Sequence, residues 1–275
     1  MSTPTPWTPP EDTVGYYDGV IRDPLHRAYW GQQEFYNVGL WSSSTTDQAA
    51  ACADLLDRLL ASSTSPEAVL DVGCGLGATT RHARRRWPRA AVHGINLSPT
   101  QVDHCRREVP DCDFRVMDAA RLDFADGSYD LVFSVEAAFH FNTRRDFFRE
   151  AHRVLRPGGV LAVSDIIVAD GPDARSIYLW DVEGANAIAD LSAYRESLAE
   201  IGFSSVEVED VTNRSWLAWC DAIERWLATR PEDGVVTRRR KSDWQESLPK
   251  LRKAVRHYLT AVARKPADGA PTGAR

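Results

Sequence analysis

The chain has 275 residues, 43% of them hydrophobic and 9 of them tryptophan, a composition typical of a globular protein of one or two domains rather than of a disordered or fibrous chain. Its 33 basic and 39 acidic residues give a net charge of −6, which argues against nucleic acid as a partner because phosphate binding needs a cationic face. No apolar run reaches the roughly 18 residues that span a membrane, and the N-terminus lacks the charged and apolar regions of a secretory signal. We therefore expect a cytoplasmic protein.

The cysteines and histidines show no pattern of metal or disulfide chemistry. The 5 cysteines include no CxxC pair, so the sequence indicates neither a disulfide framework nor a zinc site. Metal-ligand spacing is also missing among His26, His82, His93, His104, His152 and His257. We expect buried thiols and no metal.

Both ends of the chain differ in composition from its middle. Residues 1–13 and 266–275 are rich in proline and small polar residues, which cannot bury enough apolar area to offset the entropy of ordering, so we expect both to be disordered. Residues 14–62 combine a stretch rich in tyrosine and tryptophan with a segment, 46–62, whose alanines and leucines have helical spacing. This segment is predicted to be an N-terminal helical cap.

The middle of the chain has the rhythm of a parallel α/β sheet, in which apolar runs alternate with amphipathic segments. Residues 63–165 are predicted to form a cofactor-binding core, and residues 166–265 to complete it with helical inserts that cover a substrate. Strands are expected at 68–72, 91–95, 113–118, 129–135, 159–165, 204–211 and 257–265, and helices at 78–87, 98–108, 144–155 and 191–201.

A helical insert at 215–229 carries three tryptophans on one face, Trp216, Trp219 and Trp226. Core packing is the simpler interpretation, and an aromatic wall for a bulky acceptor is the alternative. A basic segment at 238–241 is interpreted as a solvated surface.

The sharpest signal is VLDVGCGLGATT at 69–80, an apolar strand followed by Gly73, Gly75 and Gly77 at the start of a helix. Glycine lets the chain turn sharply and lets a ligand lie against bare backbone at the carboxyl edge of a sheet. The spacing departs from the GxGxxG pattern of dinucleotide sites, and Asp71 would repel a pyrophosphate. A nucleotide-like ligand that carries a cationic amino group fits better.

Two later strand ends support such a ligand. Asn96 ends the second strand, near the position where related folds bind ribose hydroxyls. Asp118 ends the short third strand, where its carboxylate could accept a hydrogen bond from the amino group of adenine.

Four motifs in order, DVGCGLG, GINLSPTQ, VMDAARLDFADGSYDLVFSVEAAFHF and FFREAHRVLRPGGVLAVSDI, resemble the class I S-adenosylmethionine-dependent methyltransferases. Within that superfamily the chain is most similar to natural-product O-methyltransferases, such as those that act on the mycarosyl sugar of erythromycin. GINLSPTQ and YNVGLWS (36–42) also resemble motifs of the cyclopropane fatty acid synthase branch. The resemblance implies a Rossmann-like α/β fold, with a seven-stranded sheet whose last strand is antiparallel, helices on both faces and a helical lid.

The same resemblance implies S-adenosylmethionine as the cofactor, S-adenosylhomocysteine as its product, and a set of residues that hold them. The methionine side would be held by Asp71, Gly73, Cys74, Gly75 and Gly77, the ribose and adenine by Asn96, Leu97, Gln101, Asp118, Ala119 and Val135, and the lid contacts would come from Tyr17, Asn37 and Trp41.

His140 follows the fourth strand, where a neutral imidazole could take a proton from a substrate hydroxyl. A hydrogen-bonded core histidine is the equally simple alternative. Asp165 ends the predicted fifth strand and could orient His140, bind a second substrate hydroxyl, or serve only as a cap. Glu136 is a weaker candidate that is either structural or faces the sulfonium.

The sequence thus predicts methyl transfer from S-adenosylmethionine to a hydroxyl of a small, largely apolar natural product in secondary metabolism. Two alternatives stay open. One is C-methylation of an alkene or prenyl carbon, in which aromatic side chains stabilise a cation, and the other is a cyclase or binding protein on the same fold. The expected partner is a lipophilic small molecule, and a homo-oligomer is not excluded.

Overall fold

A computed structural model describes residues 11–20, 23–170 and 186–267. The seven strands form one sheet in the order β3-β2-β1-β4-β5-β7-β6, with β7 antiparallel to both of its neighbours. This is the predicted sheet with an antiparallel last strand. The strands are β1 (Ala68–Val72), β2 (Ala91–Asn96), β3 (Asp113–Val116), β4 (Tyr129–Val135), β5 (Leu155–Val168), β6 (Ser204–Asp210) and β7 (Val255–Arg264).

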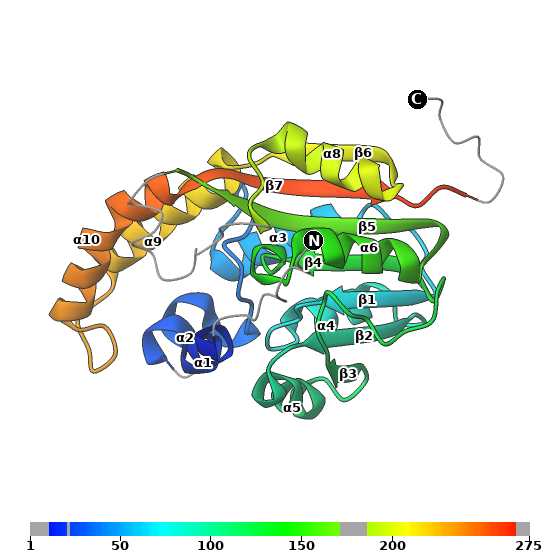
Figure 1. The fold of residues 1–275 in the computed structure, drawn as a ribbon. Coiled ribbons are helices and arrows are strands. Elements are labelled where there is room, and N and C mark those ends of the chain that lie inside the picture. Colours follow the sequence, from blue (N-terminus) through cyan, green and yellow to red (C-terminus); the bar gives the residue numbers. More distant parts are fainter. Residues whose placement is uncertain (1–10, 21–22, 171–185, 268–275) are drawn as a thin grey trace.

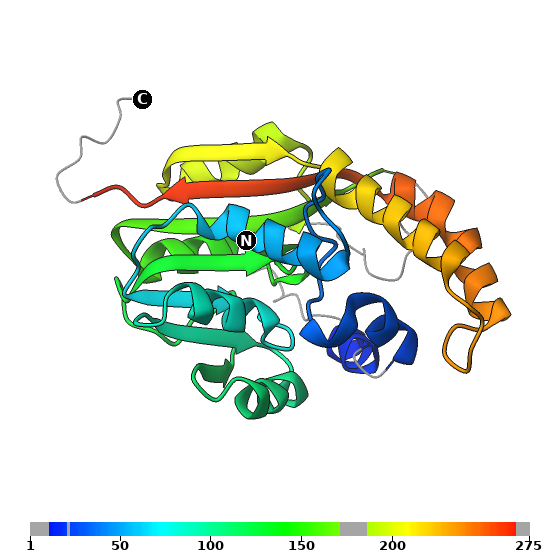
Figure 2. The same ribbon diagram turned by 180° about the vertical axis from the view of Figure 1, so that it is seen from behind.

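Helices cover both faces of this sheet (Figures 1 and 2). Successive side chains of a strand point to opposite faces; Val69 packs in the cluster that contains α3, whereas Leu70 packs in the cluster that contains α6 and α8. The helices of the core are α3 (Gln48–Leu60), α4 (Ala78–Arg86), α5 (Pro99–Glu108), α6 (Arg144–Val154) and α8 (Leu191–Ile201). Both faces of the sheet are therefore buried, as the continuous apolar runs predicted.

Two groups of helices gather at one end of the sheet, beyond the carboxyl ends of its parallel strands (Figure 1). The N-terminal group is α1 (Glu11–Val20), α2 (Pro24–Trp30) and the short η1 (Gly31–Gln33); the second is a π-helical turn (Asn213–Leu217) that leads into α9 (Ala218–Thr229), followed by α10 (Arg238–Ala254). None of the helices in the described ranges is long and apolar enough to cross a bilayer.

Several predicted boundaries were wrong. The fifth strand runs to Val168 instead of ending at Asp165, because its second half pairs with β7. The third strand ends at Val116, which leaves Asp118 in the following turn. α1 begins at Glu11, within the expected disordered N-terminus. The basic segment at 238–241 lies at the start of α10 with Arg238 and Arg239 exposed, in agreement with a solvated surface. Residues 1–10 and 268–275, most of the two predicted disordered ends, lie outside the described residues, as does 171–185 of the predicted insert.

Candidate active site

A cavity of about 570 Å³ lies at the carboxyl ends of β1, β2 and β4. One side is formed by the turns that follow these strands, and the other by α1, α2, α9 and α10. Of the predicted cofactor and catalytic residues, those that line the cavity are Tyr17, Gly73, Gly75, Asn96, Leu97, Gln101, Asp118, Ala119, Val135 and His140, whereas Asn37, Trp41, Asp71, Cys74, Gly77 and Asp165 do not.

The glycine turn brings bare backbone to the cavity. Gly73 and Gly75 both have positive φ, +79° and +53°, a conformation that other residues rarely adopt. A Cβ on Gly73 would lie 2.6 Å from the Cβ of Ala137, whereas one on Gly75 would have no atom within 4 Å and would project into open space. Gly77 has another purpose, because its Cβ position faces Cys105 at 3.1 Å and so permits close packing of α4 on α5.

Asp71 lies beneath this turn rather than in the cavity. Its Oδ2 accepts hydrogen bonds from the hydroxyls of Thr79 and Thr80 at 2.6 and 2.7 Å, which fixes the first turn of α4. The other carboxylate oxygen is buried without a hydrogen-bond partner. Burial outweighs the two hydroxyls and raises the pKa of Asp71 to about 7. Cys74 is also buried, and contact with Cys105 together with burial raises its pKa.

The buried carboxyl of Asp71 should make the stability of the protein depend on pH. The pKa of Asp71 is higher in the folded than in the unfolded state, so the protonated carboxyl contributes to the free energy of unfolding. This contribution, at most about 4 kcal/mol, is fully present below pH 4 and is lost as the pH rises through 7. We expect the difference in urea midpoint between Asp71→Asn and wild type to shift in favour of the variant when the pH is raised from 5 to 8.

The matched control is Asp130→Asn. Partial burial of Asp130 is outweighed by hydrogen bonds from backbone N–H groups and Arg156, so its pKa is lowered. Asp130 is therefore ionised in both the folded and the unfolded state at pH 5 and at pH 8, and its replacement should cost the same stability at both. An identical pH dependence for Asp71→Asn and wild type would contradict the buried, protonated state of Asp71.

Paired amides form the next part of the cavity wall. Asn96 donates to Gln101 Oε1 at 2.8 Å, so the two residues at the predicted spacing do meet. Asp18 of α1 contacts the same segment. Its Oδ1 accepts hydrogen bonds from the Ser98 hydroxyl at 2.8 Å and from Gln101 Nε2 at 3.3 Å. Asp18 was not singled out in the sequence, because nothing local links it to a segment 80 residues away.

Apolar side chains form the part of the cavity wall next to Asn96 and Gln101. Leu97 is 42% exposed, an unusual state for a leucine, and it lines the cavity together with Met117 and Ala119. The carboxylate of Asp118 lies at the same edge and accepts a hydrogen bond from the backbone of Ala120 at 2.9 Å. This edge offers an apolar surface beside a carboxylate.

Residues 37–41, which follow η1, support one wall of the cavity. Asn37 is 2% exposed, and its backbone carbonyl accepts hydrogen bonds from Trp30 Nε1 and Gln48 Nε2, both at 3.0 Å. Trp41 donates its indole N–H to the carbonyl of Val38 at 2.9 Å. Both predicted lid residues therefore support the position of Val38, which itself lines the cavity.

Three ionisable side chains, Tyr17, His140 and Glu136, line the same cavity. His140, in the short helix η2 (Ala138–His140), shares a hydrogen bond of 2.6 Å between its Nε2 and the hydroxyl of Tyr17. Burial, aided by the positive charge of Arg144, lowers the pKa of His140 to about 3. Glu136 also lines the cavity, and burial raises its pKa to about 7.

The structure does not bring Asp165 to His140. The Asp165 carboxylate is fully buried and accepts hydrogen bonds from Arg144 Nε at 2.7 Å and from the Tyr194 hydroxyl at 3.0 Å. A carboxylate inside a sheet needs such partners to offset its desolvation. The hydrogen-bond partner of His140 is therefore the hydroxyl of Tyr17 and not the predicted carboxylate of Asp165.

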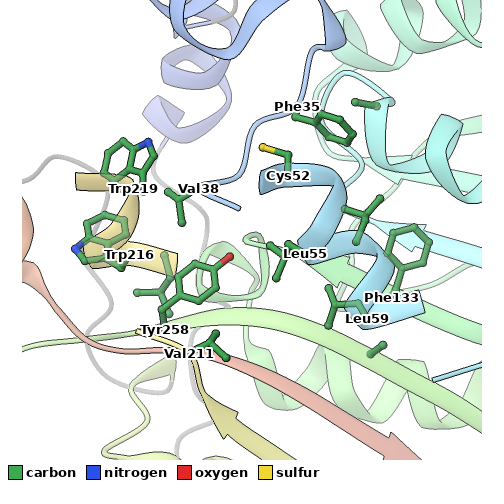
Figure 3. Packing of buried hydrophobic residues seen from close by; sticks show 14 of the residues in the cluster. Phe35, Val38, Cys52, Leu55, Leu59, Phe133, Val211, Trp216, Trp219 and Tyr258 are labelled. Atoms are coloured by element: carbon green, nitrogen blue, oxygen red, sulfur yellow. The ribbon is translucent and has the colours of Figure 1, made fainter. Parts of the chain in front are cut away.

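Aromatic side chains line the part of the cavity farthest from the glycine turn. Trp216 and Trp219 contribute to the wall as well as to the core, whereas Trp226 packs against Tyr29 outside the cavity, with ring centroids 5.3 Å apart. Figure 3 shows Trp216 and Trp219 beside Val38 and Tyr258. His26, Trp30, Tyr36 and Trp244 complete this wall, and within the described ranges no lysine or arginine lines the cavity.

Comparisons with known proteins agree with this architecture. Residues 70–163 match the model of a methyltransferase domain family. The chain is 31% identical to 27-O-demethylrifamycin SV methyltransferase of Amycolatopsis mediterranei, over 84% of this chain and 86% of that protein. It is 32% identical to erythromycin 3''-O-methyltransferase of Saccharopolyspora erythraea, over 84% of each chain.

A solved structure shares the fold. Geranyl diphosphate C-methyltransferase of Streptomyces coelicolor A3(2), solved in complex with Mg²⁺, geranyl-S-thiolodiphosphate and S-adenosyl-L-homocysteine, superposes with a TM-score of 0.70 at 18% identity, over 95% of this chain and 100% of that one.

The chain belongs to the class I S-adenosylmethionine-dependent methyltransferases. It is an enzyme that uses S-adenosylmethionine as its cofactor, and its relatives include enzymes that methylate natural products.

Proposed function

We propose that this enzyme transfers the methyl group of S-adenosylmethionine to a hydroxyl of a small, largely apolar natural product. The observation that carries the proposal is that one cavity joins two different surfaces. Backbone and amide groups of the turns after β1 and β2 line one side, aromatic rings carried by the helices line the other, and His140, Tyr17 and Glu136 belong to the same lining. Such an arrangement accommodates a polar cofactor and an apolar acceptor, with their reactive groups at the junction.

The cofactor fits the residues at the strand ends. Open space at Gly75 leaves room for the methionine part against bare backbone, the Asn96 and Gln101 amides suit the ribose hydroxyls, and Leu97 with Asp118 suits the apolar face and the amino group of adenine. We expect dissociation constants in the micromolar range, about −8 kcal/mol. When bound, the cofactor supplies a methyl group activated by a positively charged sulfur.

The acceptor half disfavours an anionic molecule. Trp216, Trp219, Trp30 and Tyr36 offer large apolar faces. Asp23, Asp243 and Ser247 add polar groups to the same wall, and the described lining holds no lysine or arginine that would pair with a phosphate or carboxylate. The two O-methyltransferases reported above are named for rifamycin and erythromycin acceptors, which supports an acceptor of natural-product type for this chain.

Methyl transfer depends more on the alignment of the two reactants than on catalytic side chains. Methyl transfer is an in-line displacement, so holding the hydroxyl oxygen against the methyl carbon in a closed, dry cavity supplies much of the rate. The Tyr17–His140 hydrogen bond closes the cap over the centre of the cavity. When the Nε2–H of a neutral His140 donates to Tyr17, its Nδ1 can accept a hydrogen bond from the acceptor hydroxyl and so orient it.

The aromatic wall keeps carbon methylation as the second candidate. Rings at the far end of the cavity could stabilise a cation formed when an alkene or prenyl carbon is methylated. Because the described lining offers aromatic rings and no lysine or arginine, an uncharged alkene is the favoured acceptor in this version. A cyclase that retains the cofactor without consuming it is the third candidate.

Matched acceptor pairs test the proposal. The enzyme is incubated with S-adenosylmethionine and lipophilic alcohols, each paired with its deoxy analogue and with the corresponding alkene, while S-adenosylhomocysteine and products are followed by mass spectrometry. We expect methylation of the alcohols alone. Turnover of the alkenes would favour carbon methylation, and a rearranged product of unchanged mass would favour a cyclase.

A further inference from the structure

Two side chains in the centre of the cavity are candidates to take a proton, and the structure distinguishes between them. His140 already uses its Nε2 in the hydrogen bond with Tyr17, and Arg144 lies close enough for its charge to oppose a second proton on the ring. An imidazole in this position accepts a hydrogen bond well and holds a proton poorly.

Glu136 has the opposite surroundings. It follows β4 directly and lines the cavity between Val135 and Ala137. Its Oε1 accepts hydrogen bonds from the Tyr258 hydroxyl at 2.6 Å and from the Val38 N–H at 2.7 Å. Both donors bind the same oxygen, which fixes the carboxyl group in one orientation.

The backbone of Glu136 is strained in order to hold that orientation. Its φ is +50°, in the left-handed region, where a side chain other than glycine costs about 1 kcal/mol or more. Its N–H donates to the carbonyl of Ser164 at 3.0 Å on β5. Strain that is kept in place by fixed hydrogen bonds is typical of functional positions, because a glycine would fit the backbone better but would supply no carboxyl group.

We infer that Glu136 is the catalytic base of this enzyme, a role that rests on the proposed O-methylation, and that His140 orients the acceptor hydroxyl. As the acceptor oxygen forms its bond to the methyl carbon, the bond between methyl and sulfur breaks and leaves its electron pair on sulfur. The hydroxyl proton passes to the Glu136 carboxylate and later leaves to solvent. The products are a methyl ether and S-adenosylhomocysteine, so atoms and charge balance.

The surroundings of Glu136 match this task. Burial raises its pKa, the hydrogen bonds from Tyr258 and Val38 lower it, and the charge of Asp165 on β5 raises it, which leaves a pKa of about 7. The other titratable groups that face it are the Tyr17 hydroxyl of α1 and the Cys52 thiol of α3, both with pKa values raised by burial and by the Glu136 charge. A base is most effective when its pKa lies near the working pH.

Glu136→Gln tests the inference in the full-length enzyme, because the glutamine carbonyl can still accept from Tyr258 and Val38. We expect kcat with a hydroxyl acceptor to fall by about a hundredfold or more, with the affinity for S-adenosylhomocysteine within about threefold of wild type. The rising limb of the wild-type pH profile near pH 7 should disappear. Glu67→Gln, an exposed isosteric change, is the matched control.

His140→Gln separates the two roles. Under this assignment it raises KM for the acceptor and retains the rising limb. Near-normal turnover by Glu136→Gln would overturn the inference. A pH profile whose rising limb is lost in His140→Gln but retained in Glu136→Gln would overturn it as well. If Glu136→Gln does not fold, Glu136→Asp tests the same role in another way, because it keeps the carboxylate but withdraws it by one methylene: kcat should fall while the rising limb is retained, and unchanged kcat would count against the inference. Absence of any methyl ether from the wild-type enzyme would instead contradict the proposed O-methylation itself.

Discussion

Replacing Gly75 with valine is expected to weaken the binding of S-adenosylmethionine and S-adenosylhomocysteine by at least about a hundredfold. A Cβ at this position meets no protein atom within 4 Å, so the valine side chain would project into the space assigned to the methionine part of the cofactor. Steric exclusion of that part removes both its contacts and its orientation. Isothermal titration calorimetry with S-adenosylhomocysteine measures the effect directly.

The backbone of Gly75 requires a control, because a positive φ strains any other residue. Gly127 has a similar φ of +63°, and its nearest neighbour to an added Cβ is a backbone atom 4.0 Å away. Gly127→Val therefore carries a comparable conformational cost away from the cavity and should bind the product as wild type does. Unchanged binding by Gly75→Val would remove the cofactor assignment of the glycine turn.

Removing residues 1–22 is expected to leave a folded protein whose turnover falls by about a hundredfold or more. The truncation removes Tyr17 and Asp18, the two side chains of α1 that contact His140 and the Ser98–Gln101 edge. Without them the reaction centre is open to water, and small losses of alignment cost about this much. Trp30, Phe35 and Val38, which pack in the hydrophobic core, are retained.

Turnover and thermal unfolding, measured on the same truncated protein, decide this prediction. The melting temperature should fall by only a few degrees while kcat falls strongly. Tyr17→Phe and Asp18→Asn, made separately, show which of the two contacts of α1 matters more, the one to His140 or the one to Ser98 and Gln101. Full activity in the truncated enzyme would mean that α1 plays no part in closing the cavity.

Features that depend on neighbouring residues could be predicted from the sequence. The buried strands produce continuous apolar runs, and the positive φ of Gly73 and Gly75 produces the glycine pattern. The meeting of Asn96 with Gln101 follows from their closeness in sequence, since Asn96 ends β2 and Gln101 lies in the first turn of α5, which starts three residues later.

Features that depend on distant residues could not be predicted. Glu136 meets Tyr258 across 122 residues and Val38 across 98 residues, and no local pattern encodes either contact. The pairing of Asp165 with Arg144, 21 residues earlier in the chain, has no local sequence signal either, and it holds Asp165 away from the predicted role of orienting His140. Hydrogen-bond partners, rather than positions along the strands, determine what these carboxylates can do.

Transfer of a labelled methyl group tests the central claim most directly. The enzyme is incubated with S-adenosylmethionine that carries a trideuterated methyl group and with a lipophilic hydroxylated acceptor, and the product is analysed by mass spectrometry and NMR. The account predicts an intact trideuteromethyl group bonded to oxygen and one equivalent of S-adenosylhomocysteine. A label bonded to carbon, or a converted acceptor that carries no label, would contradict it.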